Sequence, residues 1–83
     1  METAEILLEI SSPEATLVKM MVGSVTLPGA AGAFEVLKDH APLISSLDPG
    51  VIRYATGHEE RTLSIKSGFV EVRNNKVSVC VEV

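Results

Sequence analysis

The sequence is poor in the residues that carry most protein chemistry. Its 83 residues include one cysteine, two histidines, one tyrosine and no tryptophan. The lone cysteine, Cys80, cannot close a disulfide within the chain, and the sequence does not open with the basic, apolar and small-residue pattern of a signal peptide. We therefore expect a reducing location on the cytoplasmic side of a membrane.

Long apolar runs and basic clusters are also missing. The longest uncharged stretch, residues 20–34, includes three glycines and a proline and is shorter than the ~20 apolar residues of a spanning helix. Seven basic against eleven acidic residues give a net charge of −4. Because no lysine or arginine cluster is there to neutralise phosphates, we expect neither nucleic acid nor an anionic lipid surface as a partner.

Valine in a period of two is the main feature that the sequence does have. Eleven valines occur in the chain, and over residues 77–83 they alternate with other residues, as in a strand with one buried face. A two-residue turn at Asn74-Asn75 would place Val72 opposite Val77, because asparagine tolerates a positive φ. A second hairpin is predicted between residues 51–56 and 61–66, and shorter strands over the ranges 4–10, 25–27 and 33–36.

Two Pro-Gly pairs, Pro28-Gly29 and Pro49-Gly50, separate these segments. In a type II turn proline fixes φ at the second position and glycine takes a positive φ at the third. Both pairs are therefore interpreted as type II turns. Short strands separated by turns predict an all-β fold, an antiparallel sandwich or barrel, and 83 residues suffice for one domain that depends on neighbours for part of its stability.

The segment from Ala15 to Val22 permits two interpretations. Ser12, Pro13 and Glu14 form an N-cap, a first-turn proline and an early acid, which together would begin a helix. Alternatively, the same residues form a turn before a strand that ends at Gly23.

The residue types of a hydrolytic triad occur in Asp39, His40, Ser45 and Ser46. Neighbours on an extended chain point to opposite sides, however, so Asp39 is poorly placed to orient His40. No Gly-x-Ser-x-Gly elbow accompanies the serines. We expect no catalytic site, and His40 is interpreted as a surface or interface residue.

Metal and cofactor motifs are equally incomplete. His58, Glu59 and Glu60 fall in a predicted turn without enough further ligands for a metal site. The glycines of Gly29-Ala-Ala-Gly-Ala33 lack the lysine of a phosphate loop and the third glycine of a dinucleotide loop. Cys80 has no motif partner and is interpreted as a small core residue. We expect no metal, no cofactor and no small-molecule ligand.

Several short motifs occur in an order and spacing that resemble one protein family. The pattern is similar to the amino-terminal domain of the epsilon subunit of F-type ATP synthases, over essentially all 83 residues. The matching segments are Leu8 to Glu14, Val25 to Phe34, His40 to Leu43, Leu47 to Arg53, Ser67 to Val72 and Asn75 to Val79.

The resemblance implies a two-sheet antiparallel β-sandwich with a strand, not a helix, after Pro13. It also implies a non-catalytic rotor subunit of a proton-translocating ATP synthase, bound to the gamma subunit and seated on the ring of c subunits. Such a subunit is a peripheral component at the cytoplasmic face of the bacterial inner membrane. By motif, Ala31, Gly32, Ala33 and His40 are the residues expected to contact the c-subunit loops, in two loops held at one end of the sandwich.

Three local departures and one absence distinguish the chain from the family pattern. Glu35 replaces a small residue, Lys38-Asp39 replaces a proline and a small or polar residue, and Lys66-Ser67-Gly68 stands where Ser-Gly-Gly is usual. The family's carboxy-terminal helical hairpin has no counterpart here, so we expect a single domain over residues 1–83. The alternative function is a free-standing β-sandwich module that binds a ligand or a protein.

Overall fold

The computed structural model describes residues 4–83, which form nine β-strands and no helix. No helix among these residues could therefore cross a membrane. The strands are β1 (Ile6–Ser11), β2 (Thr16–Val22), β3 (Ser24–Leu27), β4 (Phe34–Val36), β5 (Leu43–Leu47), β6 (Gly50–Ala55), β7 (Glu60–Ile65), β8 (Ser67–Arg73) and β9 (Lys76–Glu82).

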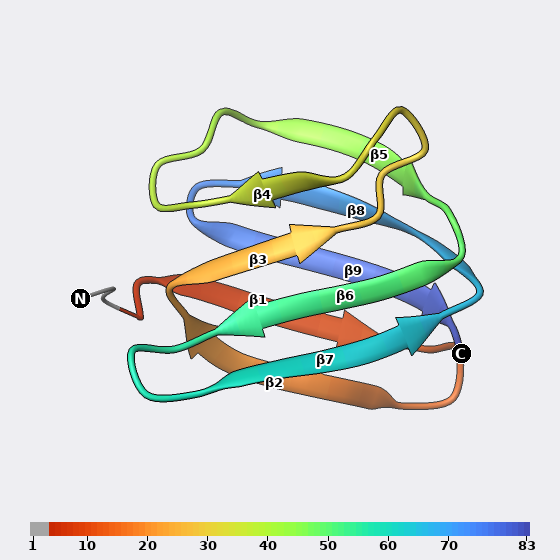
Figure 1. The fold of residues 1–83 in the computed structure, drawn as a ribbon, viewed down its shortest axis with the longest axis horizontal. Coiled ribbons are helices and arrows are strands. Elements are labelled where there is room, and N and C mark those ends of the chain that lie inside the picture. Colours follow the sequence, from red (N-terminus) through yellow and green to blue (C-terminus); the bar gives the residue numbers. More distant parts are fainter. Residues whose placement is uncertain (1–3) are drawn as a thin grey trace.

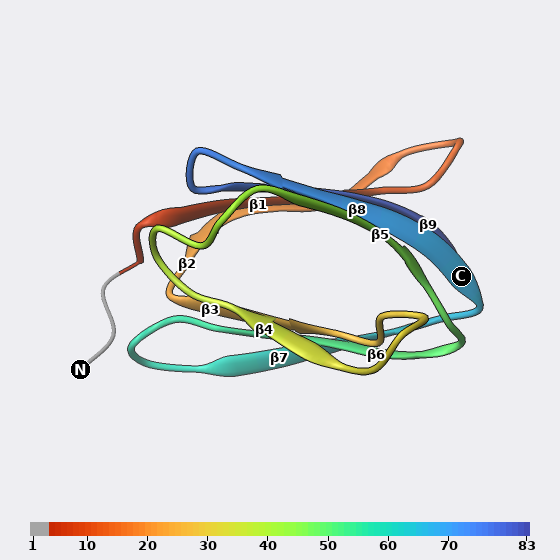
Figure 2. The same ribbon diagram turned by 90° about the horizontal axis from the view of Figure 1, so that it is seen from above.

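The strands form two sheets that face each other as a sandwich (Figures 1 and 2). The larger sheet has the order β2-β1-β9-β8-β5, and the smaller has the order β4-β3-β6-β7. All pairings between neighbouring strands are antiparallel except β1 with β9, which is parallel. The predicted two-sheet all-β sandwich is confirmed, and the parallel pair is an addition to it.

The core lies between the sheets and consists of aliphatic side chains and one tyrosine. Alternation along each strand supplies it, because every second side chain points inward. Its buried members are Ile6, Leu8, Ile10, Val22, Val25, Leu27, Val36, Leu47, Ile52, Tyr54, Ile65, Val70, Val72, Val77, Val79 and Val81.

The hairpin of β8 and β9 forms in the predicted register. Val72 pairs with Val77, and Asn74 and Asn75 have φ of 51° and 59°, as a type I′ turn requires. Val83, the last residue of the predicted alternation, lies beyond β9 and is 54% exposed. The apolar face therefore ends at Val81.

The segment after Pro13 is strand β2, so the strand interpretation is confirmed and the helical one is wrong. The Ser12 amide donates to the Ala15 carbonyl (2.8 Å), and the Ala15 amide donates to the Ser12 hydroxyl (3.3 Å). These bonds close a turn that returns the chain alongside β1. Val18 and Met20 then pack against the core. The burial of alternate side chains in a strand therefore outweighed the helix-capping signal of Ser12 to Glu14.

Two further predictions are wrong. Gly32 (φ 129°) is the one described glycine with a positive φ, so the Pro-Gly pairs at 28–29 and 49–50 are not type II turns. Gly29 is required for space instead, since a Cβ there would lie 2.7 Å from the Gly32 carbonyl oxygen and 2.8 Å from the Phe34 ring. Cys80 is exposed, not in the core, because the inward positions of β9 are its valines.

Candidate functional site

The four predicted contact residues lie in two turns that flank strand β4. Ala31, Gly32 and Ala33 are exposed in the turn before β4, and His40 is half-buried in the loop after it. Figure 1 shows these two turns at opposite ends of the sandwich. The expectation that one end holds both is wrong, because β4 runs between them. They instead share the long side formed by the edge strands β4 and β5.

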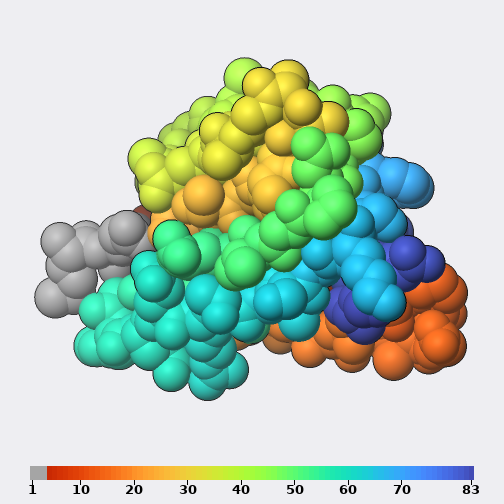
Figure 3. Space-filling model, turned by 45° about the vertical axis from the view of Figure 1, so that its right-hand side comes forward, coloured from red at the N-terminus to blue at the C-terminus, as the bar shows by residue number. Residues whose placement is uncertain are grey.

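The turn before β4 is fixed to the end of β5 and to the first residue after it. The Ala30 amide donates to the Ser46 carbonyl (3.0 Å), and the Asp48 amide donates to the Pro28 carbonyl (2.8 Å). Within the turn, the Gly32 amide donates to the Gly29 carbonyl (2.9 Å). In Figure 3 the yellow segment that includes this turn forms a raised ridge at the top of the molecule. Main-chain bonds therefore hold an exposed turn of small side chains.

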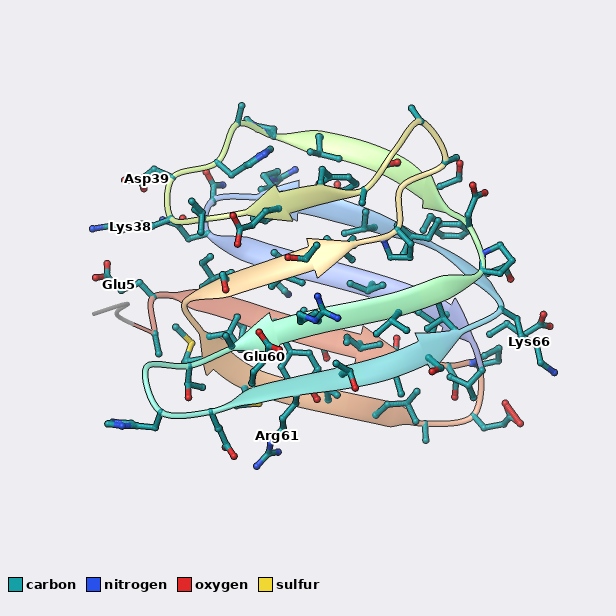
Figure 4. All side chains as sticks on the ribbon, viewed as in Figure 1. Glu5, Lys38, Asp39, Glu60, Arg61 and Lys66 are labelled. Atoms are coloured by element: carbon teal, nitrogen blue, oxygen red, sulfur yellow. The ribbon has the colours of Figure 1, made fainter. Side chains whose placement is uncertain are left out.

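The loop after β4 is held by side chains of the residues that depart from the family pattern. Lys38 Nζ lies 2.9 Å from Glu5 Oε2. Asp39 and Asn75 exchange two hydrogen bonds: the Asp39 amide donates to Asn75 Oδ1 (2.6 Å), and Asn75 Nδ2 donates to Asp39 Oδ1 (3.1 Å). Figure 4 shows Glu5, Lys38 and Asp39 at the same end of the molecule.

The ionisation of Lys38 responds to this environment. A hydrogen bond to the Glu5 carboxylate, together with the negative charges of Glu5 and Asp39, raises the lysine pKa above its ordinary value of 10.5. Both side chains of the pair are about half exposed, so solvent screens the attraction.

The hydrogen bonds of His40 determine its tautomer. Nδ1 lies 2.7 Å from the Ala41 carbonyl oxygen, and a carbonyl oxygen only accepts, so Nδ1 carries a proton. In the neutral ring Nε2 is then an acceptor. The His40 amide donates to the Leu37 carbonyl (3.2 Å). This arrangement makes Nε2 the acceptor nitrogen of the neutral ring.

The triad residue types make contacts other than those of a triad. The carboxylate of Asp39 accepts from Asn75, His40 contacts the carbonyl of its neighbour Ala41, and the Ser45 hydroxyl donates to the Ser46 carbonyl (2.9 Å). No serine, histidine and carboxylate are therefore linked in series among residues 4–83.

The turn that includes His58 is organised by a threonine. Thr56 Oγ1 accepts from the amides of His58 and Glu59 (both 3.2 Å), and the Glu59 carboxylate pairs with Arg61 (2.9 Å). Across the described part of the chain, no three His, Cys, Asp or Glu side chains are grouped as metal ligands.

The outer face of the larger sheet has a feature that the sequence reasoning missed. Ile44 on β5 is 78% exposed and Phe69 on β8 is 62% exposed. Ser46 pairs with Phe69 and Ile44 pairs with Glu71, so the two apolar side chains are diagonal neighbours on one face. Phe69 lies outward because Val70 and Val72 occupy the inward positions of β8. The alternation of side chains along this strand could therefore have predicted from the sequence that Phe69 is exposed.

Comparison with known proteins identifies the family. A family model described as the ATP synthase, Delta/Epsilon chain, beta-sandwich domain matches residues 5–83. The ATP synthase epsilon chain of Leptospira interrogans is 34% identical over 82 residues, which cover 99% of this chain and 65% of that protein. That of Desulfitobacterium hafniense is 41% identical over 75 residues, or 90% of this chain and 57% of that protein. The chain thus spans about three-fifths of these relatives.

Two solved structures have the same fold. A chain of the Euglena gracilis mitochondrial ATP synthase, solved with OSCP, F1 and the c-ring, matches 98% of this chain and 52% of its own length, with a TM-score of 0.88 and 23% identity. A chain from the central stalk and c-ring of the Tetrahymena thermophila enzyme matches 100% of this chain and 67% of its own length, with a TM-score of 0.81 and 11% identity. By the family match and the identity to its relatives, the chain belongs to the family of ATP synthase delta and epsilon chains, as their β-sandwich domain.

Proposed function

We propose that the chain is a non-catalytic subunit of the central stalk of a proton-translocating F-type ATP synthase, where it joins the gamma subunit to the c-ring. The family match over residues 5–83 carries this proposal. The relatives are bacterial epsilon chains, which supports a peripheral position at the cytoplasmic face of the bacterial inner membrane. The chain reaches the membrane through the complex alone.

A rotor subunit acts by contact, and the loops around β4 are suited to that. Ala31, Gly32, Ala33 and His40 are the proposed contacts to the c-subunit loops. Because they lie at both ends of β4, the proposed contact runs along the side formed by β4 and β5. The turn is fixed by main-chain hydrogen bonds, and the loop that holds His40 is fixed to the β8–β9 turn by the Asp39–Asn75 hydrogen bonds, so a load applied at either place is transmitted to the sandwich.

A bridging subunit needs a second surface, and the apolar side chains on the outer face of the larger sheet support that face as the candidate. Ile44 and Phe69 expose most of their apolar surface there, and an aromatic side chain is a frequent anchor of protein interfaces. We assign this face to the gamma subunit.

The direct experiment is co-purification. The chain, with an affinity tag on its first residue, is expressed together with the gamma and c subunits of the same organism and isolated under mild detergent. The proposal expects gamma and the c-ring to be retained in stoichiometric amounts. Isolation of the chain alone, with gamma and c present in the same extract, would support the alternative of a free-standing binding module.

A further inference from the structure

We propose that Asp39 and Asn75 form a latch that holds the loop 37–42 against the β8–β9 turn and so positions His40. The latch is a property of this chain by itself. Its consequence for the c-ring rests on the function proposed above. Asp39 and Asn75 are positioning residues, since they act on the contact through the loop between them and His40.

The geometry of the pair is reciprocal. The Asp39 amide donates to Asn75 Oδ1 (2.6 Å), while Asn75 Nδ2 donates to Asp39 Oδ1 (3.1 Å). The second bond ends on a carboxylate, and hydrogen bonds to ionised acceptors are stronger than neutral ones. One side chain thus serves as acceptor and donor for the same partner, which fixes both its position and its orientation.

Both residues have a backbone conformation that needs compensation. Asp39 has φ of 63° and Asn75 has φ of 59°. The left-handed region is unfavourable for residues with a side chain, and aspartate and asparagine are the types that tolerate it best. The reciprocal bonds stabilise both left-handed conformations. Loss of the bonds at one residue therefore also destabilises the left-handed conformation of the other.

Asn75 also connects the loop to the start of β1. Its carbonyl accepts from the Leu7 amide (2.9 Å), and Lys38, adjacent to Asp39, pairs with Glu5 just before β1. The loop passes from β4 in the smaller sheet to β5 in the larger one. Strand β4 has three residues and one neighbouring strand, and it therefore offers the loop little support. The latch supplies a fixed point at the middle of that passage.

His40 follows Asp39 directly, so its position depends on the backbone angles of Asp39. Its amide bonds to Leu37 within the same loop, and its ring bonds to Ala41. Neither bond reaches another strand. The loop that holds His40 is therefore connected to the rest of the sandwich by strands β4 and β5 at its two ends, by the Lys38–Glu5 pair and, next to His40 itself, by the Asp39–Asn75 latch.

Amide hydrogen exchange, followed residue by residue by NMR on the 83-residue chain, tests the latch. Asn75→Gly keeps the positive φ and removes both bonds. We expect exchange of the Asp39 amide to accelerate ~10-fold or more, the scale of one lost hydrogen bond. Asn74→Gly is the matched control, because it makes the same change in the same turn at a residue whose side chain has no hydrogen bond to the described residues of the loop. It should leave the exchange rate of the Asp39 amide within about threefold of the rate in the unaltered chain. Asp39→Asn retains an acceptor oxygen and should preserve the protection.

A second variant covers the case in which Asn75→Gly weakens the hairpin. Asp39→Gly keeps the positive φ at position 39 and leaves the turn unchanged, while it removes the bond from Asn75 Nδ2. It should accelerate exchange at positions 39 and 40 and not at the amides of β9. Equal rates in the two asparagine variants, or an unprotected Asp39 amide in the unaltered chain, would overturn the latch.

The functional consequence has a separate measurement. In assembled ATP synthase lacking Cys80, cysteines at positions 33 and 40 are crosslinked to cysteines in the c-subunit loops. Asn75→Gly should lower the yield at position 40 at least ~3-fold and leave position 33 unchanged, and Asn74→Gly should change neither. If the exchange result holds but neither position crosslinks in the unaltered chain, the latch stands and the c-ring assignment fails. If both positions crosslink and Asn75→Gly has no effect at 40, the positioning role is wrong.

Discussion

Asp39 and Asn75, 36 residues apart in the chain, meet as two left-handed residues that hydrogen-bond each other in both directions. Their contact joins the loop between the two sheets to the turn of the last hairpin. The same loop holds Lys38, which pairs with Glu5. A loop without regular structure is thereby tied both to the β8–β9 turn and to the residue just before β1.

Shortening a buried side chain of the core should destabilise the chain strongly. Leu8 is fully buried on β1, an interior strand of the larger sheet, and its replacement by alanine leaves a cavity. Leu8→Ala is expected to lower the free energy of unfolding in urea by about 2–5 kcal/mol. Ile44→Ala, at a highly exposed position, should change it by less than about 0.5 kcal/mol. Similar losses for the two variants would contradict the assignment of the core.

Space, not a positive φ, is what requires glycine at position 29. A Cβ there would meet the Gly32 carbonyl and the Phe34 ring, so Gly29→Ala should destabilise the chain by about 1–3 kcal/mol. Ala31→Ser adds one atom at an exposed position of the same turn and should be neutral within about 0.5 kcal/mol. Urea denaturation measures both variants. A neutral Gly29→Ala would show that the turn relaxes.

Because of the Lys38–Glu5 pair, we expect the stability of the folded chain to depend on pH in the alkaline range. The lysine pKa is raised in the folded chain above its ordinary value of 10.5, so folding favours the protonated form. The stabilisation of the fold by this pair is therefore complete below pH 10.5, and it is lost as the pH rises through the raised pKa of Lys38. The difference in melting temperature between the unaltered chain and Glu5→Gln should be constant from about pH 8 to 9.5 and shrink above 10.5. A difference that grows above that pH would give the opposite sign and refute the pairing.

The outer face of the larger sheet should be more important for gamma binding than that of the smaller sheet. Phe69→Ser removes an exposed aromatic side chain and should weaken binding of isolated gamma subunit ~10-fold or more. Val51→Ser is the control, because Val51 is an exposed apolar residue of β6 in the other sheet. Titration calorimetry measures both. A larger loss for Val51→Ser would move the gamma surface to the smaller sheet.

The sequence predicted those features that depend on neighbouring residues. Alternation over residues 77–83 and a two-asparagine turn were enough to give the register of β8 and β9, and the Pro-Gly pairs located connections although not their conformations. The pairing of Asp39 with Asn75 and the parallel contact of β1 with β9 join distant segments, on which local pattern has no information. Strand β5 was not predicted, since Ile44-Ser45-Ser46 does not alternate.

Tertiary packing overrode local rules in two places, at one rejected alternative and at one wrong prediction. Ser12 to Glu14 permit a helix, but a helix would have withdrawn Val18 and Met20 from the core. The general tendency of cysteine to be buried failed for Cys80, because strand parity decides which face a side chain occupies. The proposed contact residues around β4 came from family resemblance. Their separation to the two ends of β4 followed from the path of the chain, which the motif does not encode.

Cysteine crosslinking within the assembled ATP synthase decides whether the β4–β5 side of the sandwich lies against the c-ring. In a background lacking Cys80, single cysteines are placed at positions 33 and 40, beside β4, and at position 58, in the turn that leads to β7 on the opposite edge of the smaller sheet. We expect efficient linkage of positions 33 and 40 to c-subunit loop cysteines and markedly less linkage at position 58. Equal linkage at all three positions, or none at 33 and 40, would contradict the assignment of the β4–β5 side to the c-ring.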